Sequence, residues 1–558
     1  MKHFIKYSVL ILSAVMLMSS CEDFLTTPSK SQMSTENFYN SPKEVDQALI
    51  GVYGALKPFA KYYFGMSELR SDNMFEIKEA RSNDFCECAQ FDNSNLVDNG
   101  LIKKCWDEHY TLISAANVLI DKMQHVAFAT EIIKKQYEAE ARFLRALAYF
   151  DLVRFYGRIP LSLNTLFVEG AFSLKQSEPQ EVYAAIVDDL IYAYQNLQTT
   201  AVDYAGNVKK ERVSVVAAKA LLGKVYLQMA GYPYYIEEAR TPEGVGNTTD
   251  AAKKCLKEVI DYSVQSGKYW THTVEDWGKQ FFSEGDNQTF IFEIQYANEK
   301  DQGNTYTPLS RGGSATGDKY VGANKTGGYH TYIERQLANS FLAFNEGDYE
   351  QVTDDYQIPR YIDQRAKYTV FIGATLNEET SLWEVTGTAE NDNPISKFLE
   401  HNYRRLSVGY QSIDASVIDQ TYWPQNFPIL RIEDVMLLYA ELVGNTEEGY
   451  DMLNKIHERA TGRTYSNLSP EQFQEAVTME RRYELLGEGH RWFDQIRQNT
   501  FVKDIQSTFN YYAENIDPAN ATTYKAYATR VDQRYHVYPI PLSQMQISAG
   551  LYTQNDGY

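Results

Sequence analysis

The sequence feature that most constrains the fold is a long stripe of apolar residues at helical spacing. Its members recur three or four residues apart: Ile133, Tyr137, Ala141, Leu144, Ala148, Leu152 and Phe155. Because residues at these spacings share one face of an α-helix, the stripe predicts a long helix with one buried face, ended by Gly157 and Pro160. A second stripe of this kind consists of Trp106, Tyr110, Ile113, Asn117 and Ile120.

Three helix starts are marked by a serine three residues before Glu or Gln, with a proline near the first helical position. The pairs are Ser41 and Glu44, Ser177 and Gln180, and Ser469 and Gln472. In such a capping box, the two side chains accept hydrogen bonds from backbone N–H groups that the first helical turn leaves without partners. We therefore expect helices to begin directly after these three serines.

Two predicted helix pairs suggest the architecture. Leu222 and Gly223, followed by Tyr226, match the first helix of a tetratricopeptide repeat, where the small residue lets the partner helix approach. The partner helix is predicted over residues 250–262, and a similar pair over residues 431–445 and 447–460. Since the pairs are degenerate and far apart, the sequence predicts a compact, mostly α protein with long insertions, not an open solenoid.

The segment from residue 300 to 332 differs in composition from the rest of the chain. It holds seven glycines and four tyrosines in 33 residues and has few aliphatic side chains. Such a segment cannot form a core helix, so we expect a large aromatic loop, and loops on a rigid scaffold often carry binding residues. Just before it, the alternating apolar residues Phe290, Phe292, Ile294 and Tyr296 predict a short strand.

The N-terminus has the order of features found in a bacterial lipoprotein signal. Lys2 and Lys6 precede a short apolar run over residues 9–18, and small residues lead directly to Cys21. The run is about half the ~20 residues needed to span a bilayer, which fits a signal peptide. We expect cleavage before Cys21, lipid on its sulfur, and a polar tether over residues 22–36. A plain secretory signal is the alternative.

Charge and aromatic content reduce the number of possible functions further. Acidic residues number 74 and basic residues 53, which gives a net charge of −21. This balance argues against a general nucleic-acid binder, which needs clustered cations. The chain contains 43 Tyr, 27 Phe and 6 Trp, and side chains with a flat apolar face and a polar group suit interfaces and sugar-binding surfaces.

The four cysteines after Cys21 leave three readings open. With His109, a cluster of Cys86, Cys88 and Cys105 could bind a metal, although the spacing of the first pair is shorter than in most zinc sites. A disulfide to Cys105 would be compatible with export. Buried free thiols, Cys255 included, are the third reading.

The charged block from residue 480 to 497 could be taken for a catalytic site. It contains four acidic and four basic side chains: Glu480, Glu484, Glu488, Asp494, Arg481, Arg482, Arg491 and Arg497. Many are three or four residues apart, a spacing at which opposite charges pair on a helix. Nearby cations lower the pKa of a carboxyl group, whereas a glycosidase acid needs a raised one. We therefore predict a structural ion-pair network.

The remaining possibility is that aromatic side chains bind sugar, because the C–H faces of sugars pack on aromatic rings. The candidate ligand contacts are Tyr306, Tyr320 and Tyr329 in the expected glycine-rich loop, Trp383 in a polar loop near residues 377–394, Trp423, and Tyr62, Tyr63, Asp72 and Asn73 early in the chain. Trp106, Trp270, Trp277 and Trp492 are assigned to packing instead.

Several segments together resemble the SusD/RagB family of outer-membrane nutrient-binding lipoproteins. The matching stretches are residues 20–25, 37–39, 51–53, 138–146, 156–160, 430–435, 439–441 and 538–541, and the most specific is 480–494, ERRYELLGEGHRWFD. They follow one another in order along nearly the whole chain after the signal.

The resemblance implies tetratricopeptide-like helix pairs packed against an irregular C-terminal region with long loops and a few short strands. We divide the chain into a signal peptide (1–20), a lipidated tether (21–36), an N-terminal helical region (37–269) and a C-terminal region (270–558). The family implies a surface-exposed, lipid-anchored outer-membrane protein without enzymatic activity or organic cofactor; calcium stays open. Its partners would be an oligosaccharide or polysaccharide and a SusC-like TonB-dependent transporter, with no nucleic acid. The family's ligand site has no motif that assigns residues by position.

Two other functions are compatible with the sequence. A helix-repeat adaptor or a carrier of non-glycan nutrient such as peptide would present a groove lined by helices. A helical-barrel glycoside hydrolase or lyase would place two carboxylates about 5–9 Å apart across a cleft.

Overall fold

The computed structural model describes residues 38–76, 84–165, 170, 173–241, 246–282, 289–297, 303, 331–353, 356–369, 374–377, 382–385 and 425–558. The first half of this part is built from helices: α3 (Pro42–Gly54), α4 (Phe59–Tyr62), the π-helix η1 (Tyr63–Glu68), α5 (Asp84–Ala89), α6 (Gly100–Lys122), α7 (Glu131–Tyr156), α9 (Pro179–Asn196), α10 (Val215–Ala230), α11 (Thr248–Ser266) and α12 (Val274–Lys279).

The second half carries further helices and most of the strands. The helices are α14 (Arg335–Phe341), α15 (Ala366–Thr369), α17 (Ile432–Val443), α18 (Glu447–Thr461), α19 (Pro470–Glu484), α20 (Arg491–Arg497), α21 (Phe501–Tyr511), α22 (Ala521–Arg530) and α23 (Leu542–Ile547). The strands of the whole described chain are β1 (Met74–Glu76), β2 (Ile159–Pro160), β3 (Gln176–Ser177), β4 (Ala201–Val202), β5 (Val208–Lys209), β6 (Phe292–Ile294), β7 (Thr331–Ile333), β8 (Phe344–Thr353), β9 (Tyr356–Tyr361), β10 (Ala374–Asn377), β11 (Leu382–Val385) and β12 (Phe427–Leu430). The mostly α fold class is confirmed.

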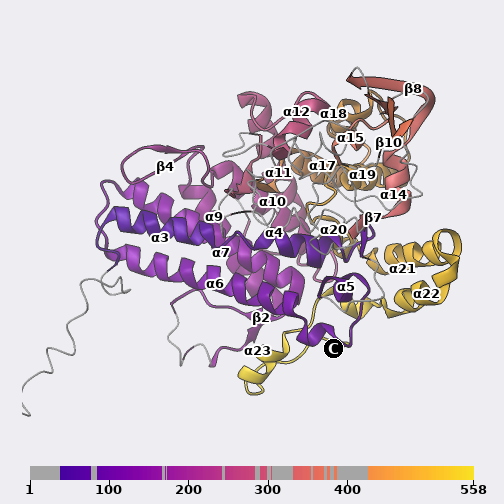
Figure 1. Cartoon of the computed structure of the whole chain (residues 1–558). Helices are drawn as coiled ribbons and strands as arrows, with labels where there is room; N and C mark the ends of the chain where they lie inside the picture. Colours follow the sequence, from indigo (N-terminus) through magenta and orange to yellow (C-terminus); the bar gives the residue numbers. More distant parts are fainter. Residues whose placement is uncertain are drawn as a thin grey trace, which may run out of the picture.

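The long helix predicted from the apolar stripe is α7. Thr130 caps its first turn, and it ends at Gly157, whose φ of 69° lies in the region that favours glycine. Figure 1 shows α3, α6 and α7 lying side by side, and every stripe residue of α7 except the half-buried Ile133 is buried.

Two of the three predicted helix starts are confirmed. The Ser41 and Ser469 side chains accept hydrogen bonds from the backbone N–H groups of Glu44 and Gln472. The third prediction is wrong by one residue, because Glu178 rather than Ser177 is the N-cap of α9. The Glu178 carboxylate therefore has the capping role that was predicted for the Ser177 hydroxyl.

The helix pair predicted around Gly223 is formed by α10 and α11. A Cβ atom on Gly223 would lie 2.8 Å from Cδ2 of Leu256 on α11, so the two helices approach closely because this residue has no side chain. The predicted pair after residue 431 is likewise confirmed as α17 and α18, and α11 packs against α17. One continuous apolar core therefore joins residues of both halves.

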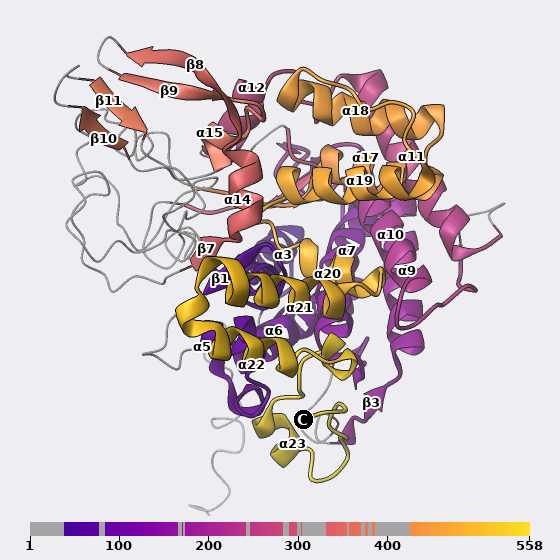
Figure 2. The same cartoon turned by 90° about the vertical axis from the view of Figure 1, so that its right-hand side faces the viewer.

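Small antiparallel ladders tie distant parts of the chain together. β1 pairs with β7, and β6 pairs with β12, while β8 to β11 form a four-stranded sheet that extends beyond the helices at the upper left of Figure 2. The strand expected in residues 281–296 is β6, so that prediction is confirmed. None of the helices that the structure describes combines the length and the apolar character needed to cross a bilayer.

Candidate functional site

Most of the aromatic residues predicted to contact ligand lie outside the described residues. This holds for Tyr306, Tyr320, Tyr329 and Trp423, and also for the lipidation site Cys21. Trp383 is an exception, because the structure places it in strand β11, where it pairs with Leu376 of β10. The expectation that Trp383 sits in a loop is therefore wrong. Its neighbours Leu382 and Val385 favour an extended strand.

Two of the described ladders lie where the chain enters and leaves the segments that carry the candidate aromatic residues and lie outside the described residues. In the β1–β7 ladder, Glu76 pairs with Thr331, so residues 77–83 and 304–330 attach at the same end. In the β6–β12 ladder, Ile294 pairs with Phe427, and the Tyr296 backbone N–H donates to Oδ1 of Asn426 at 2.9 Å. Four segments that carry or flank the candidate aromatics are thus anchored on two short ladders.

Tyr62 and Tyr63, which are predicted ligand contacts, lie in the core. Both side chains are buried; the Tyr62 hydroxyl donates to Glu108, and the Tyr63 hydroxyl donates to Asp151 at 2.5 Å. The sequence could not reveal this, because aromatic residues in a Tyr-rich chain look alike whether they pack or bind.

Asp72 and Asn73, just before strand β1, are also buried, and their side chains accept hydrogen bonds from arginines. Asp72 Oδ1 accepts from Arg491 Nε at 2.7 Å, and Asn73 Oδ1 accepts from Arg482 Nε at 2.9 Å. Burial alone would raise the pKa of Asp72, but the Arg482 and Arg491 guanidinium groups outweigh it and lower the pKa to about 2.

A buried cluster of opposite charges confirms the predicted ion-pair network. The predicted local pairing is present between Asp494 and Arg497, at 2.9 Å, whereas the pairs of the cluster itself join more distant residues. The members of the cluster are Arg365, Arg431, Arg459, Glu433, Glu480, Glu484 and Glu488. Arg431 donates to Glu484 at 3.0 Å and to Glu488 at 2.8 Å, although they lie far apart in sequence. The block is not one helix, since α19 ends at Glu484 and α20 begins at Arg491.

Arginines beside Glu480 and Asp494 lower the pKa values of these two carboxyl groups, whereas a general acid needs a raised pKa. Burial would raise the pKa of Glu480, but Arg365 and His457 lower it, and the pKa of Asp494 falls to about 2 beside Arg481 and Arg497. Carboxyl groups with lowered pKa values are ionised at neutral pH and cannot supply the proton that glycoside cleavage requires.

Among the three readings of the cysteines, the structure has buried free thiols. Cys86, Cys88, Cys105 and Cys255 form no disulfide. Burial raises the pKa of the Cys88 and Cys255 thiols to about 12, which makes both unreactive. Within the described ranges, no three His, Cys, Asp or Glu side chains are arranged to hold a metal ion.

The tryptophans assigned to packing fall largely where they were predicted. Trp106, Trp277 and Trp492 are buried, and the Trp277 Nε1–H donates to Glu484 at 2.5 Å. Trp270 is half-buried and lies under the cations of Lys455 and Arg459, 4.8 and 4.5 Å from its ring centre.

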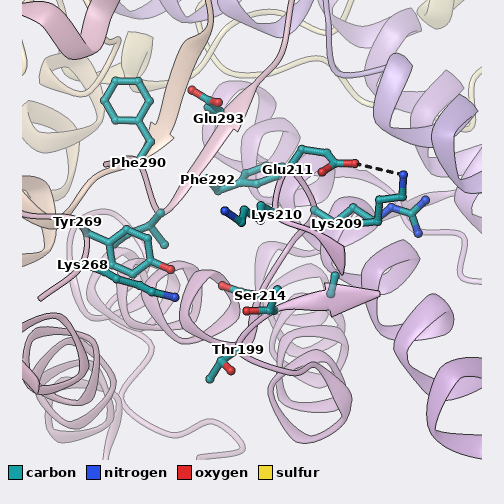
Figure 3. A pocket seen from close by; sticks show the side chains of 14 residues that line it. Thr199, Lys209, Lys210, Glu211, Ser214, Lys268, Tyr269, Phe290, Phe292 and Glu293 are labelled. Atoms are coloured by element: carbon teal, nitrogen blue, oxygen red, sulfur yellow. Dashed lines mark ion pairs between the residues drawn. The ribbon is translucent and has the colours of Figure 1, made fainter. Parts of the chain in front are cut away.

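A small polar pocket lies between the β4–β5 hairpin, the end of α11 and strand β6. Its volume is about 200 Å³, and Figure 3 shows Lys268 and Tyr269 on one side and Lys210 and Ser214 on another. The Lys209 ammonium pairs weakly with Glu211, at 4.0 Å. The pocket has both signs of charge on its walls and room for a single small group.

A larger open groove, here called the α3–α6 groove, runs between these two helices. Its volume is about 960 Å³. Its aromatic lining consists of Phe38, Tyr39, Trp106, Tyr110 and Tyr552, and its polar lining includes Gln47, Ser114, Asn117, Asn164 and Gln544.

Sequence reasoning missed the α3–α6 groove. Trp106, Tyr110 and Ile113 belong to the second apolar stripe and were expected to face only the core. The polar Asn117 within that stripe was the available signal that this helix face is not wholly apolar.

Comparison with known families matches both halves of the chain. Residues 288–558 match the model described as "SusD family", and residues 23–227 match the model described as "Starch-binding associating with outer membrane". Two curated relatives are similar over most of the chain. SusD-like protein P38 of Formosa agariphila is 26% identical over 533 residues, which is 90% of this chain and 93% of that protein. A SusD-like protein of Bacteroides ovatus is 24% identical over 92% of this chain and 86% of its own length.

Solved structures share the fold at low sequence identity. A SusD homologue from Bacteroides thetaiotaomicron has a TM-score of 0.71 at 22% identity, covering 94% of this chain and 98% of that chain. A laminarin-binding SusD-like protein has a TM-score of 0.65 at 23% identity, covering 93% of this chain and all of the other. Surface glycan-binding protein A from Bacteroides fluxus has a TM-score of 0.64 at 19% identity and covers 93% of this chain and 100% of its own.

Proposed function

This chain belongs to the SusD/RagB family, and we propose that it binds carbohydrate at a bacterial outer membrane without transforming it. The observation that carries the proposal is the match of residues 23–227 to a family described as starch-binding and associated with the outer membrane. It is supported by similar folds in proteins named for laminarin binding and for surface glycan binding.

The finer part of the proposal concerns where the protein sits and what it does with its ligand. Cys21 carries lipid, including palmitate, and residues 22–36 tether the domain on the cell surface. The bound oligosaccharide or polysaccharide is passed to a SusC-like TonB-dependent transporter. Aromatic packing contributes roughly 0.5–1.5 kcal/mol per ring beyond area burial, so a few rings give a modest affinity that permits release. A Kd of 1 mM corresponds to about −4 kcal/mol.

The proposed ligand surface is the set of aromatic segments anchored on the β1–β7 and β6–β12 ladders. Tyr306, Tyr320, Tyr329 and Trp423 stand in segments that attach to these ladders, and Trp383 stands in β11 of the neighbouring sheet. These segments are continuous in sequence with the strands of the ladders, and binding residues are often carried by segments that a rigid scaffold holds at their ends.

An affinity screen tests the carbohydrate proposal. The full chain, purified from membranes in detergent, is screened against plant, host and microbial glycans and then measured by calorimetry. We expect one class of glycan to bind, with no cleavage product by chromatography. Failure of every glycan, or turnover of any, would contradict the proposal.

Variants separate binding by the aromatic segments from a structural role. Tyr320→Ala and Trp383→Ala should each weaken glycan binding about 2- to 13-fold, the range that roughly 0.5–1.5 kcal/mol per ring predicts. The melting temperature should change little. Tyr235→Ala is the control, since Tyr235 is exposed and lies outside these segments. Variants that melt early but bind normally would overturn the assignment.

The transporter partnership needs its own experiment. In the bacterium that makes the protein, cross-linking on intact cells followed by purification of this chain should recover a TonB-dependent transporter. Recovery of the chain alone, under conditions where a known transporter complex is captured, would argue against delivery.

A further inference from the structure

The α3–α6 groove is a second place where a carbohydrate could be held, away from the ladders that anchor the aromatic segments. It follows α6 from Trp106 to Val118, and the 12 helical steps between these residues span about 18 Å. Its volume of about 960 Å³ is at the upper end of ordinary ligand pockets, and the pocket of Figure 3 is about a fifth as large. The groove can therefore take a short linear chain.

The rings along the groove are held in place while part of each stays accessible. Tyr39, Tyr110 and Tyr552 are half-buried, and the Tyr110 hydroxyl donates to the Pro160 carbonyl at 2.7 Å. The Tyr110 ring also packs on buried Trp106, with ring centres 5.1 Å apart. Rings fixed before binding lose little conformational freedom when a ligand packs on them.

Tyr39 stands at the rim of the groove in an unusual backbone conformation. Its φ is +73°, in the left-handed region that bulky residues rarely adopt, and its ring meets Phe38 edge-on at 5.0 Å. Strain of this kind is most often found at functional sites. Phe38 and Tyr39, two successive aromatic residues, both line the groove.

Several polar side chains of the groove have donors and acceptors that form no hydrogen bond within the described protein. Among the described residues, the side chains of Tyr39, Gln47, Ser114 and Tyr552 make no hydrogen bond with the protein. By contrast, both Asn117 side-chain atoms are used, donating to Ser162 and accepting from Arg145. Hydroxyl and amide groups next to exposed ring faces are the combination that recognises sugar hydroxyls and C–H faces together.

The lining of the groove also sets the charge of its ligand. Asp107 is the one side chain of the groove's described lining that is charged at neutral pH, and it pairs with Lys103. An anionic ligand would find no opposite charge in this lining, a cationic ligand would have to compete with Lys103 for Asp107, and an acyl chain would leave the polar groups without hydrogen-bond partners. The lining fits a neutral ligand rich in hydroxyl groups.

We propose that the α3–α6 groove is a second carbohydrate subsite, which holds a neutral oligosaccharide along α6. This inference rests on the proposed carbohydrate-binding function. It adds the location of a second binding site and the charge of the ligand that the site takes. Two separate subsites would let one polysaccharide chain contact the protein twice, which raises the overall affinity without new contacts at either site.

Two glycines of α3 provide a matched test. Gly51 lines the groove, whereas Gly54 does not, and a Cβ on either would meet no atom within 4 Å. Gly51→Leu therefore fills the groove without disturbing the fold, and Gly54→Leu is the same change on the same helix outside it. The probes are maltohexaose, laminarihexaose, cellohexaose, xylohexaose and mannohexaose, titrated by calorimetry into the full chain in detergent.

We expect Gly51→Leu to weaken binding of at least one of these probes about 10-fold, while Gly54→Leu leaves it unchanged. Tyr39→Ala and Tyr552→Ala should reproduce part of the loss. In a Trp383→Ala background, the binding that remains should weaken about a further 10-fold when Gly51→Leu is added.

Two results would overturn the second subsite. If neutral hexasaccharides bind and Gly51→Leu has no effect, the groove is not a subsite, although carbohydrate binding stands. If none of the probes binds, the groove proposal fails whether or not charged glycans bind elsewhere. Loss of a co-purifying protein in Gly51→Leu, with sugar affinity unchanged, would assign the groove to a protein partner instead.

Discussion

At the scale of single residues, Glu140 is the side chain whose protonation most affects stability near neutral pH. It is buried on α7 and accepts from Tyr53 at 2.8 Å and from Gln136 at 3.0 Å. Burial raises its pKa from the usual 4.5 to about 7, and Arg212 opposes this only in part. The folded state therefore holds a proton between pH 4.5 and 7 that the unfolded state has lost.

The sign of the pH effect follows from this proton. Because the folded state binds more protons in that window, stability falls as the pH rises from 4.5 to 7, by on the order of 3 kcal/mol. We predict that Glu140→Gln removes this fall. Melting temperatures of variant and wild type, compared at pH 5 and pH 8, measure it.

His490 requires a separate control, because its effect has the opposite sign. Burial and the neighbouring Lys224 lower its pKa to about 3, so its contribution to stability rises with pH between 3 and 6.5. Only the difference between Glu140→Gln and wild type isolates Glu140. An unchanged difference between the two pH values in the variant would contradict the prediction.

Arg431 is a residue whose loss should lower stability strongly. Its guanidinium is buried and donates to three carboxylates, those of Glu433, Glu484 and Glu488. Arg431→Met leaves these charges without a full set of partners, which should lower the free energy of unfolding by about 3–5 kcal/mol in urea titrations.

An exposed ion pair serves as the comparison for Arg431. Arg240 and Asp188 pair at 2.7 Å, but both side chains are more than half exposed. Arg240→Met should change stability by less than about 1 kcal/mol. If the two variants lose similar amounts, the buried cluster is not the stabilising network described here.

At the scale of elements, the packing of α10 against α11 depends on the absence of a side chain at Gly223. Gly223→Leu would place atoms where Leu256 already lies, at 2.8 Å from the first added carbon. We predict a loss of at least about 1–3 kcal/mol in the free energy of unfolding. Gly54→Leu, in open space on α3, should instead stabilise slightly because leucine favours helix. Equal effects of the two changes would refute the role of Gly223.

Elements with a strong local pattern could be predicted from the sequence, and those decided by distant partners could not. The α7 helix follows from apolar spacing, and the α10–α11 and α17–α18 pairs follow from local similarity to a tetratricopeptide repeat. Strand β8 carries polar residues along most of its length, so its state depends on pairing with β9. The ion-pair partners Arg365 and Glu484 are 119 residues apart, and no local pattern connects them.

The candidate site shows the same division. Aromatic residues in glycine-rich or polar segments can be recognised as candidates, but burial of Tyr62 and Tyr63 depends on helices that follow later in the chain. The α3–α6 groove was beyond sequence reasoning, because Tyr39 and Tyr552 come from opposite ends of the chain and meet only in the folded structure.

At the scale of the whole molecule, the lipid on Cys21 should determine where the protein is found. We predict that Cys21→Ala abolishes incorporation of labelled palmitate and releases the protein from the outer-membrane fraction. Cell fractionation and palmitate labelling measure the two effects, and glycan affinity of the purified protein should not change. Retention of label in Cys21→Ala would place the lipid elsewhere or refute it.

The first and last parts of the chain are joined by buried contacts. The Glu68 carboxylate accepts from the backbone N–H groups of Gly487 and Gly489 at 3.0 and 2.9 Å, and the Tyr538 hydroxyl donates to the Met66 carbonyl at 2.9 Å. We predict that a chain ending at residue 269 does not fold, because Glu68 and Asp72 would be left without their partners. A cooperative melting transition in that fragment would contradict this.

These long-range contacts have a consequence for biosynthesis. Glu68 is made early, yet it cannot be buried until residues 487–489 are present, and Met66 waits for Tyr538. The segment around residues 66–68 therefore stays without its native partners until nearly the whole chain has been made. We expect the incomplete chain to expose apolar surface for that time, which makes it a target for chaperones.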